Sequence, residues 1–126
     1  MKRVLVAEDD PDTATAIKGT LEEHLPVAVD HVTNGALVLD QISASHPDLV
    51  ILDVSMPGLN GIDVFDLLRG SASFVDVPVL FLTAQPDRAE QAFARFGISD
   101  VMAKPFDAGA LVRRVDDLLS RATRVA

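Results

Sequence analysis

The sequence alternates short apolar runs with longer segments of helical period, and this alternation restricts the fold more than any other feature. The apolar runs are rich in Val, Ile and Leu and predict strands at residues 3–7, 27–32, 48–53, 77–83 and 98–103. The first, third and fourth runs are almost continuous in apolar residues, as strands buried on both faces are. Such strands separated by helices predict a parallel sheet covered on both sides, so we expect a doubly wound α/β fold of (βα)5 type.

Five segments between and after these runs repeat apolar residues every three or four positions, which predicts amphipathic helices. They are expected to begin at Pro11, near Asn34, near Asn60, at Pro86 and at Asp107. Asp10 and Asp107 have side chains suited to N-caps. The predicted apolar faces are Ile17, Leu21 and Leu25; Ala36, Leu39 and Ile42; Ile62, Phe65 and Leu68; Ala89, Phe93 and Phe96; and Leu111, Val115 and Leu118.

Composition narrows the class of protein further. The chain has 126 residues, which fits one domain, and we expect a single domain over residues 1–126 with no output domain. A net charge of −8 disfavours direct binding to nucleic acid, and the absence of cysteine excludes disulfides and thiolate metal sites. No apolar run approaches the ~20 residues of a membrane span, and no signal peptide precedes the first strand. We therefore expect a cytoplasmic protein with no membrane association.

Polar side chains gather where the predicted strands end. Asp53 ends the third run, in "LVILDVSMPGLNG"; Glu8 and Asp9 follow the first, Thr83 ends the fourth and Lys104 follows the fifth. Open parallel sheets bind ligands at the carboxyl ends of their strands, so these five side chains are expected on one rim. Each alone is an ordinary loop or surface residue, but close carboxylates repel by about 4 kcal/mol per pair at ~4 Å and an effective dielectric constant of about 20. A cation should bind there, and oxygen ligands suit Mg²⁺.

Four motifs occur in an order and spacing that resemble the response-regulator receiver domains of two-component signalling: "VLVAEDDP", "LVILDVSMPGLNG", "VLFLTA" and "AKPF". The resemblance covers essentially the whole chain. It implies the flavodoxin-like form of the fold, with five parallel strands in the order 2-1-3-4-5. It also implies a cis peptide bond between Lys104 and Pro105.

The same resemblance implies a role for each rim residue. Asp53 would be the phosphoacceptor, and Mg²⁺, or Mn²⁺ in its place, would be held by Asp53, Glu8, Asp9 and the backbone carbonyl of Ser55. Thr83 and Lys104 would contact the phosphoryl group. Asp10, the third residue of the acidic run, is interpreted as a helix N-cap rather than a ligand.

The implied function is a signalling switch, with no enzymatic activity beyond its own phosphotransfer and slow autodephosphorylation. His24, His31 and His46 fit no phosphotransfer pattern and are expected at the surface or at helix ends. The donor phosphohistidine is therefore expected on a sensor histidine kinase or a histidine-phosphotransfer protein, with an unknown downstream protein target and an open oligomeric state. Ala14, Ile17 and Leu21 of the first helix are either the docking surface that the resemblance implies or ordinary core residues.

Two other classes of protein share part of this pattern. A hydrolase of the haloacid dehalogenase type also combines a nucleophilic Asp, Mg²⁺, a Ser or Thr and a Lys, but its D-x-D nucleophile motif lies on the first strand and a cap domain usually accompanies it. An unphosphorylated binding module would not need the complete set of site residues. One departure from the family concerns output, because Val101 stands where receivers commonly carry an aromatic residue.

Overall fold

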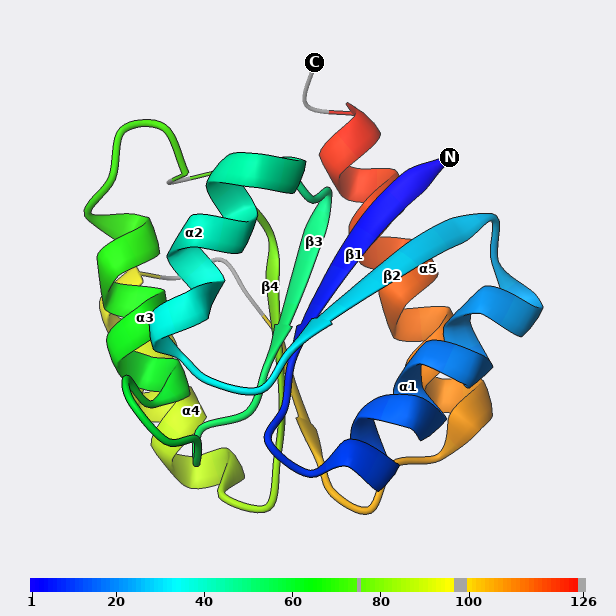
Figure 1. Cartoon of the computed structure of the whole chain (residues 1–126), viewed down its shortest axis with the longest axis horizontal. Helices are drawn as coiled ribbons and strands as arrows, with labels where there is room; N and C mark the ends of the chain where they lie inside the picture. Colours follow the sequence, from blue (N-terminus) through cyan, green and yellow to red (C-terminus); the bar gives the residue numbers. More distant parts are fainter. Residues whose placement is uncertain (75, 97–99, 125–126) are drawn as a thin grey trace.

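The computed structural model describes residues 1–74, 76–96 and 100–124 and has the predicted alternation of strands and helices (Figure 1). All ten predicted elements are present. In chain order they are β1 (Lys2–Ala7), α1 (Pro11–His24), β2 (Val27–Val32), α2 (Ala36–Ser45), β3 (Leu49–Leu52), α3 (Gly61–Arg69), β4 (Val79–Thr83), α4 (Pro86–Phe96), β5 (Asp100–Ala103) and α5 (Ala108–Arg124).

The strands form one five-stranded sheet in the order β2-β1-β3-β4-β5, with every neighbouring pair parallel. The predicted fold class and strand order are confirmed. β3 is one residue shorter at each end than predicted, although the N–H groups of Asp48 and Asp53 still bond to the β1 carbonyls of Arg3 and Ala7. β4 starts after Pro78, which has no N–H to give to the ladder. The predicted first residues of the fifth strand, 98 and 99, lie outside the described residues.

Alternate residues of the central strands face opposite sides of the sheet and enter two separate cores. One core packs Val4, Val6, Leu49 and Ile51 against α1 and α5, through buried residues that include the predicted Ile17, Leu21, Leu111, Val115 and Leu118. The other packs Leu5, Val50, Leu52 and Phe81 against α2, α3 and α4, through residues that include Ile42, Phe65, Leu68 and Ala89. Helices therefore cover both faces of the sheet, as Figure 1 shows.

Side-chain caps start several of the helices. Asp10 caps α1 by accepting from the N–H of Thr13, Asn60 caps α3 through Asp63, and Asp107 accepts from the N–H of Ala110 at 2.8 Å. α2 begins at Ala36, two residues after the predicted start, and Asn34 Oδ1 accepts the Ala36 N–H at 2.8 Å.

The predicted apolar face of α2 was partly wrong. Val38 and Ile42 are the buried residues, whereas Ala36 is exposed and Leu39 is only partly buried. A stripe with a constant spacing of three residues drifts around a helix of 3.6 residues per turn, so Ala36, Leu39 and Ile42 cannot all face the sheet.

Three further expectations concern the other helices. Ala14, Ile17 and Leu21 of α1 are buried, so core packing is the correct interpretation and they are not a docking surface. The side chains of Phe93 and Phe96 lie outside the described residues. Among the residues that are described, no helix combines the length and apolar character needed to cross a membrane.

Candidate functional site

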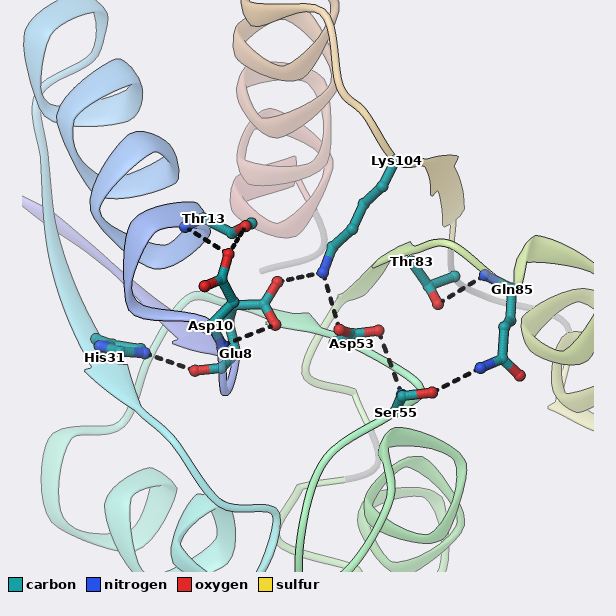
Figure 2. Close-up of polar contacts among 9 residues, drawn as sticks. All are labelled: Glu8, Asp10, Thr13, His31, Asp53, Ser55, Thr83, Gln85 and Lys104. Atoms are coloured by element: carbon teal, nitrogen blue, oxygen red, sulfur yellow. Dashed lines mark hydrogen bonds and ion pairs between the residues drawn. The ribbon is translucent and has the colours of Figure 1, made fainter.

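Four strand ends meet at one rim of the sheet because all the strands run in the same direction. β1 ends at Ala7, which pairs with Leu52 of β3, so Glu8 and Asp53 leave the sheet side by side. Thr83 ends β4 and pairs with Ala103, the last residue of β5, which places Lys104 on the same rim. Figure 2 shows these side chains converging from their separate strands.

The acidic residues form a compact cluster. Glu8, Asp9 and Asp53 each offer a carboxylate oxygen, and these oxygens all lie within 4.8 Å of one another. Glu8 and Asp53 are buried, with exposed fractions of 2% and 7%, while Asp9 is exposed. Three oxygen donors of like charge at this separation fit a hard divalent cation such as Mg²⁺, which is usually held by one or two carboxylates together with water.

Lys104 places its ammonium group between two of these carboxylates. Its Nζ donates to Asp53 Oδ2 at 2.9 Å and also to Glu8 Oε1, and the peptide bond between Lys104 and Pro105 is cis, as expected. Burial works to lower the pKa of Lys104, but its hydrogen bonds to Asp53 and Glu8 outweigh that effect and raise it. The ammonium therefore stays charged beside Asp53.

Burial acts in the opposite sense on Glu8. It raises the pKa of this carboxyl from 4.5 to about 7, against the hydrogen bond from Lys104, and the negative charge of Asp53 adds to the increase. Even with Lys104 in place, the metal-free site therefore carries too little positive charge to balance its carboxylates. A bound cation would supply the missing charge.

The loop after Asp53 is folded tightly against the acidic residue. The N–H of Ser55 donates to Asp53 Oδ1 at 3.2 Å. A Cβ atom on Gly61 would lie 2.0 Å from the Asp53 carbonyl oxygen, so only glycine allows this close approach, and Gly58 turns the chain with a φ of 76°. Glycine is therefore required at Gly61 by the contact with Asp53 and favoured at Gly58 by the positive φ.

A polar network on the other side of Asp53 was not predicted from the sequence. Thr83 Oγ1 accepts from the N–H of Gln85 at 3.0 Å, and Gln85 Nε2 donates to Ser55 Oγ at 2.6 Å. Arg88 donates to Gln85 Oε1 at 2.9 Å. Gln85 thereby links the β3–α3 and β4–α4 loops, and its position two residues after Thr83 is the one sequence signal that could have drawn attention to it (Figure 2).

Asp10 and His31 lie next to the acidic cluster. Asp10 accepts from both the N–H and the hydroxyl of Thr13, so it serves as the predicted N-cap. His31 is exposed, as expected of a surface residue, but its Nε2 lies 2.7 Å from the carbonyl oxygen of Glu8. No local pattern in the sequence connects His31 with the site, because His31 and Glu8 are 23 positions apart.

Together, these side chains determine which ions and groups the rim can bind. Asp53 has a nearly buried carboxylate, with oxygens of Glu8 and Asp9 within 4.8 Å and the Lys104 ammonium at 2.9 Å. Thr83 and Ser55 add hydroxyl groups at the same edge. Such a site can hold a divalent cation and an incoming tetrahedral oxyanion beside a carboxylate nucleophile.

Comparisons with known proteins agree with this geometry. The family model for the response regulator receiver domain matches residues 4–116. The transcriptional activator protein IrlR of Burkholderia pseudomallei is 39% identical over 120 residues, covering 94% of this chain and 51% of IrlR. The DNA-binding response regulator MtrA of Mycolicibacterium smegmatis is 37% identical over 122 residues, covering 95% of this chain and 51% of MtrA. The chain thus spans about half the length of these curated relatives.

A solved structure gives the same result for the fold. The crystal structure of a putative response regulator from Chloroflexus aurantiacus superposes with a TM-score of 0.87 at 33% sequence identity. The match covers 95% of this chain and 98% of that structure.

Proposed function

This chain belongs to the response-regulator receiver family, and from that premise we propose that it is a phosphorylation-activated switch whose phosphoacceptor is Asp53. The observation that supports this proposal best is the position of Asp53. It follows a fully buried strand, lies in a cluster of three carboxylates and contacts the Lys104 ammonium at 2.9 Å.

Asp53 would accept the phosphoryl group directly. A carboxylate oxygen forms a bond to phosphorus as the P–N bond of the donor phosphohistidine breaks, and the bonding electrons return to the donor imidazole, which takes up a proton from water. Because a carboxylate is a weak nucleophile, the site must hold the donor in line and stabilise charge on the equatorial oxygens. Lys104 is placed to bind one of these oxygens, and the Thr83 hydroxyl is placed at the same edge to donate a hydrogen bond to another.

Glu8, Asp9, Asp53 and the backbone carbonyl of Ser55 are the proposed ligands of Mg²⁺, with Mn²⁺ as a substitute. When bound, the ion neutralises negative charge on the carboxylates and on the phosphoryl oxygens. The carboxylate cluster supports this assignment through its oxygen-only donors and its spacing. Asp10 is excluded from the ligand set because its carboxylate is engaged with Thr13.

The proposed donor is a sensor histidine kinase or a histidine-phosphotransfer protein, which also favours a cytoplasmic location.

Apart from its own phosphotransfer and slow autodephosphorylation, the domain is proposed to act by changing its binding surface for a downstream protein. The network from Thr83 through Gln85 to Ser55 and Arg88 supports this, because a Thr83 hydroxyl that turns toward a phosphoryl group must give up its present geometry with Gln85.

A small acyl-phosphate donor tests the proposal without a partner protein. Wild-type protein with Mg²⁺ should gain one phosphoryl group by intact-mass measurement and lose it slowly, whereas Asp53→Asn should gain none. Asp63→Asn is the matched control, because Asp63 is an exposed carboxylate on α3. Full labelling of Asp53→Asn would refute the assignment, and steady multiple turnover by the wild type would indicate a phosphatase instead.

A further inference from the structure

We infer that His31 is a positioning residue for the acidic pair: its ring fixes the peptide group between Glu8 and Asp9 and thereby strengthens binding of the divalent cation. The inference rests on the proposed function, since it concerns residues assigned above as metal ligands. It goes beyond that function in giving a role to a side chain on the edge strand β2.

The backbone contacts around Glu8 show where the sheet stops supporting the acidic pair. The last residue pair between β1 and β2 is Ala7 with Val32, and the Glu8 N–H donates to the Val32 carbonyl at 3.0 Å. On the other side, the Ala7 carbonyl accepts the N–H of Asp53 at 3.1 Å. After Glu8 the chain leaves the sheet toward the N-cap of α1.

The Glu8 carbonyl is the next acceptor along the chain, and the His31 ring meets it. The distance from Nε2 to the carbonyl oxygen is 2.7 Å, and Figure 2 shows the ring reaching from β2 to this atom. A carbonyl oxygen can only accept, so Nε2 must carry the hydrogen. His31 thus extends the link between β1 and β2 by one hydrogen bond beyond the end of the ladder.

This hydrogen bond acts on both members of the acidic pair. The Glu8 carbonyl belongs to the planar peptide group that joins Glu8 to Asp9, so rotation of that plane changes ψ of Glu8 and φ of Asp9 together. The Glu8 side chain is also held by burial and by Lys104, whereas the Asp9 side chain is exposed. The direction of the Asp9 carboxylate therefore depends more on its backbone, and His31 contributes most to placing that ligand.

His24 provides a natural comparison within the same chain. Its Nδ1 also lies near a backbone carbonyl, that of Thr20 at 2.9 Å, but both residues belong to α1. A histidine that only supports local structure should behave like His24. A histidine that positions the acidic pair should in addition affect the cation.

The test is isothermal titration calorimetry with Mg²⁺ at a single pH, on wild type, His31→Leu, His31→Gln and His24→Leu. Loss of one net hydrogen bond predicts an affinity roughly threefold to tenfold weaker for His31→Leu. His31→Gln should recover most of the loss, because its side-chain amide can donate to the same carbonyl. His24→Leu should match the wild type, and the Asp9 amide resonance of the metal-free protein should shift in His31→Leu more than in His31→Gln.

Three outcomes would overturn the inference: an affinity of His31→Leu within twofold of wild type, an equal loss in His31→Gln, or an equal loss in His24→Leu. Each of these leaves the proposed function intact if wild-type protein binds Mg²⁺ and takes the acyl-phosphate label. A wild type that neither binds Mg²⁺ nor takes the label would instead refute the proposed function.

Discussion

Asp53 and Glu8 are charged groups placed where a folded protein rarely puts them, and Lys104 offsets only part of the cost. Burial of a carboxylate disfavours its ionised form unless hydrogen bonds or positive charge compensate. Lys104 contacts both residues, yet the pKa of Glu8 is still raised to about 7. The buried carboxylates therefore lower the stability of the metal-free protein, while their geometry suits a bound cation.

Because burial raises the pKa of Glu8, the free energy of unfolding should depend on pH. The unfolded chain loses the Glu8 proton near pH 4.5 and the folded chain near pH 7, so the folded state holds more protons between these values. The contribution of Glu8 to the free energy of unfolding is therefore present below pH 4.5 and is lost as pH rises toward 7. In Glu8→Gln, the free energy of unfolding should fall less across this window than in the wild type.

Urea unfolding in the presence of a chelator measures this difference. Circular dichroism is the suitable probe because the chain contains no Trp or Tyr. Glu23→Gln, an exposed position on α1, is the control and should follow the wild-type pH profile. Identical profiles for Glu8→Gln and wild type would contradict the prediction.

At the scale of elements, local sequence signals were sufficient to predict most of the structure. The five apolar runs and the N-caps Asp10 and Asp107 were recognised because each depends on a few adjacent residues. The same holds for the motif residues at the strand ends, whose shared rim follows from parallel strands. The buried face of α2 was predicted only in part, because the predicted stripe repeats every three residues and drifts around a helix of 3.6 residues per turn.

The contacts of Gln85 and His31 could not be predicted for a different reason. Gln85 bonds to Ser55, 30 positions away, and His31 bonds to Glu8, 23 positions away. Such contacts depend on the exact path of two loops or strand ends. Gln and His in those positions are also ordinary surface residues, so nothing local distinguishes them.

The β4–α4 loop is the element expected to move on phosphorylation. Thr83 now accepts from the Gln85 N–H, and a phosphoryl group on Asp53 would draw the Thr83 hydroxyl toward itself. Val101 pairs with Phe81 in the sheet and packs against the α2–α3–α4 core; being β-branched, it is stiff at χ1 and cannot follow as a large ring would. With beryllofluoride as the phosphoryl mimic, large amide shift changes are expected at residues 84–88 and a quiet side chain at Val101. A rotamer switch at Val101, or changes spread evenly over β5, would contradict this.

The β3–α3 loop gives a second prediction at this scale. Gly61→Ala would drive a Cβ atom to 2.0 Å from the Asp53 carbonyl oxygen, and a backbone atom cannot move aside cheaply. We expect a loss of about 1–3 kcal/mol in the free energy of unfolding, with weaker Mg²⁺ binding as Asp53 shifts. Gly19→Ala is the control: it lies within α1 with no atom within 4 Å of the added Cβ and should stabilise by about 0.5–1 kcal/mol. Equal stability changes for the two variants would show that the backbone at Asp53 moves aside at little cost, contrary to the prediction.

At the scale of the whole molecule, one sheet carries both the site and two open edges. The strand order leaves β2 and β5 at the edges of the sheet, and an exposed edge can pair with another chain. The expectation of no output domain stays a prediction, since the chain spans about half the length of its curated relatives. Within the described residues, side chains of the domain itself protect one of these edges.

α1 supplies such protection at β2. Lys18 Nζ donates to the Val29 carbonyl at 2.9 Å, and Glu22 Oε2 accepts the Val29 N–H at 3.0 Å. Lys18 and Glu22 also pair with each other at 2.9 Å, one helical turn apart. Both backbone groups of Val29 are thus occupied by side chains at the place where a second strand would add.

The last prediction is that removing this pair promotes self-association through β2. Lys18→Ala/Glu22→Ala leaves the net charge unchanged and frees both backbone groups of Val29, so sedimentation velocity should show more concentration-dependent association than in the wild type. Arg121→Ala/Asp117→Ala is the matched control, because it also removes one i,i+4 ion pair from an exposed helix face, on α5 rather than α1. Equal sedimentation of the two double variants would contradict the prediction.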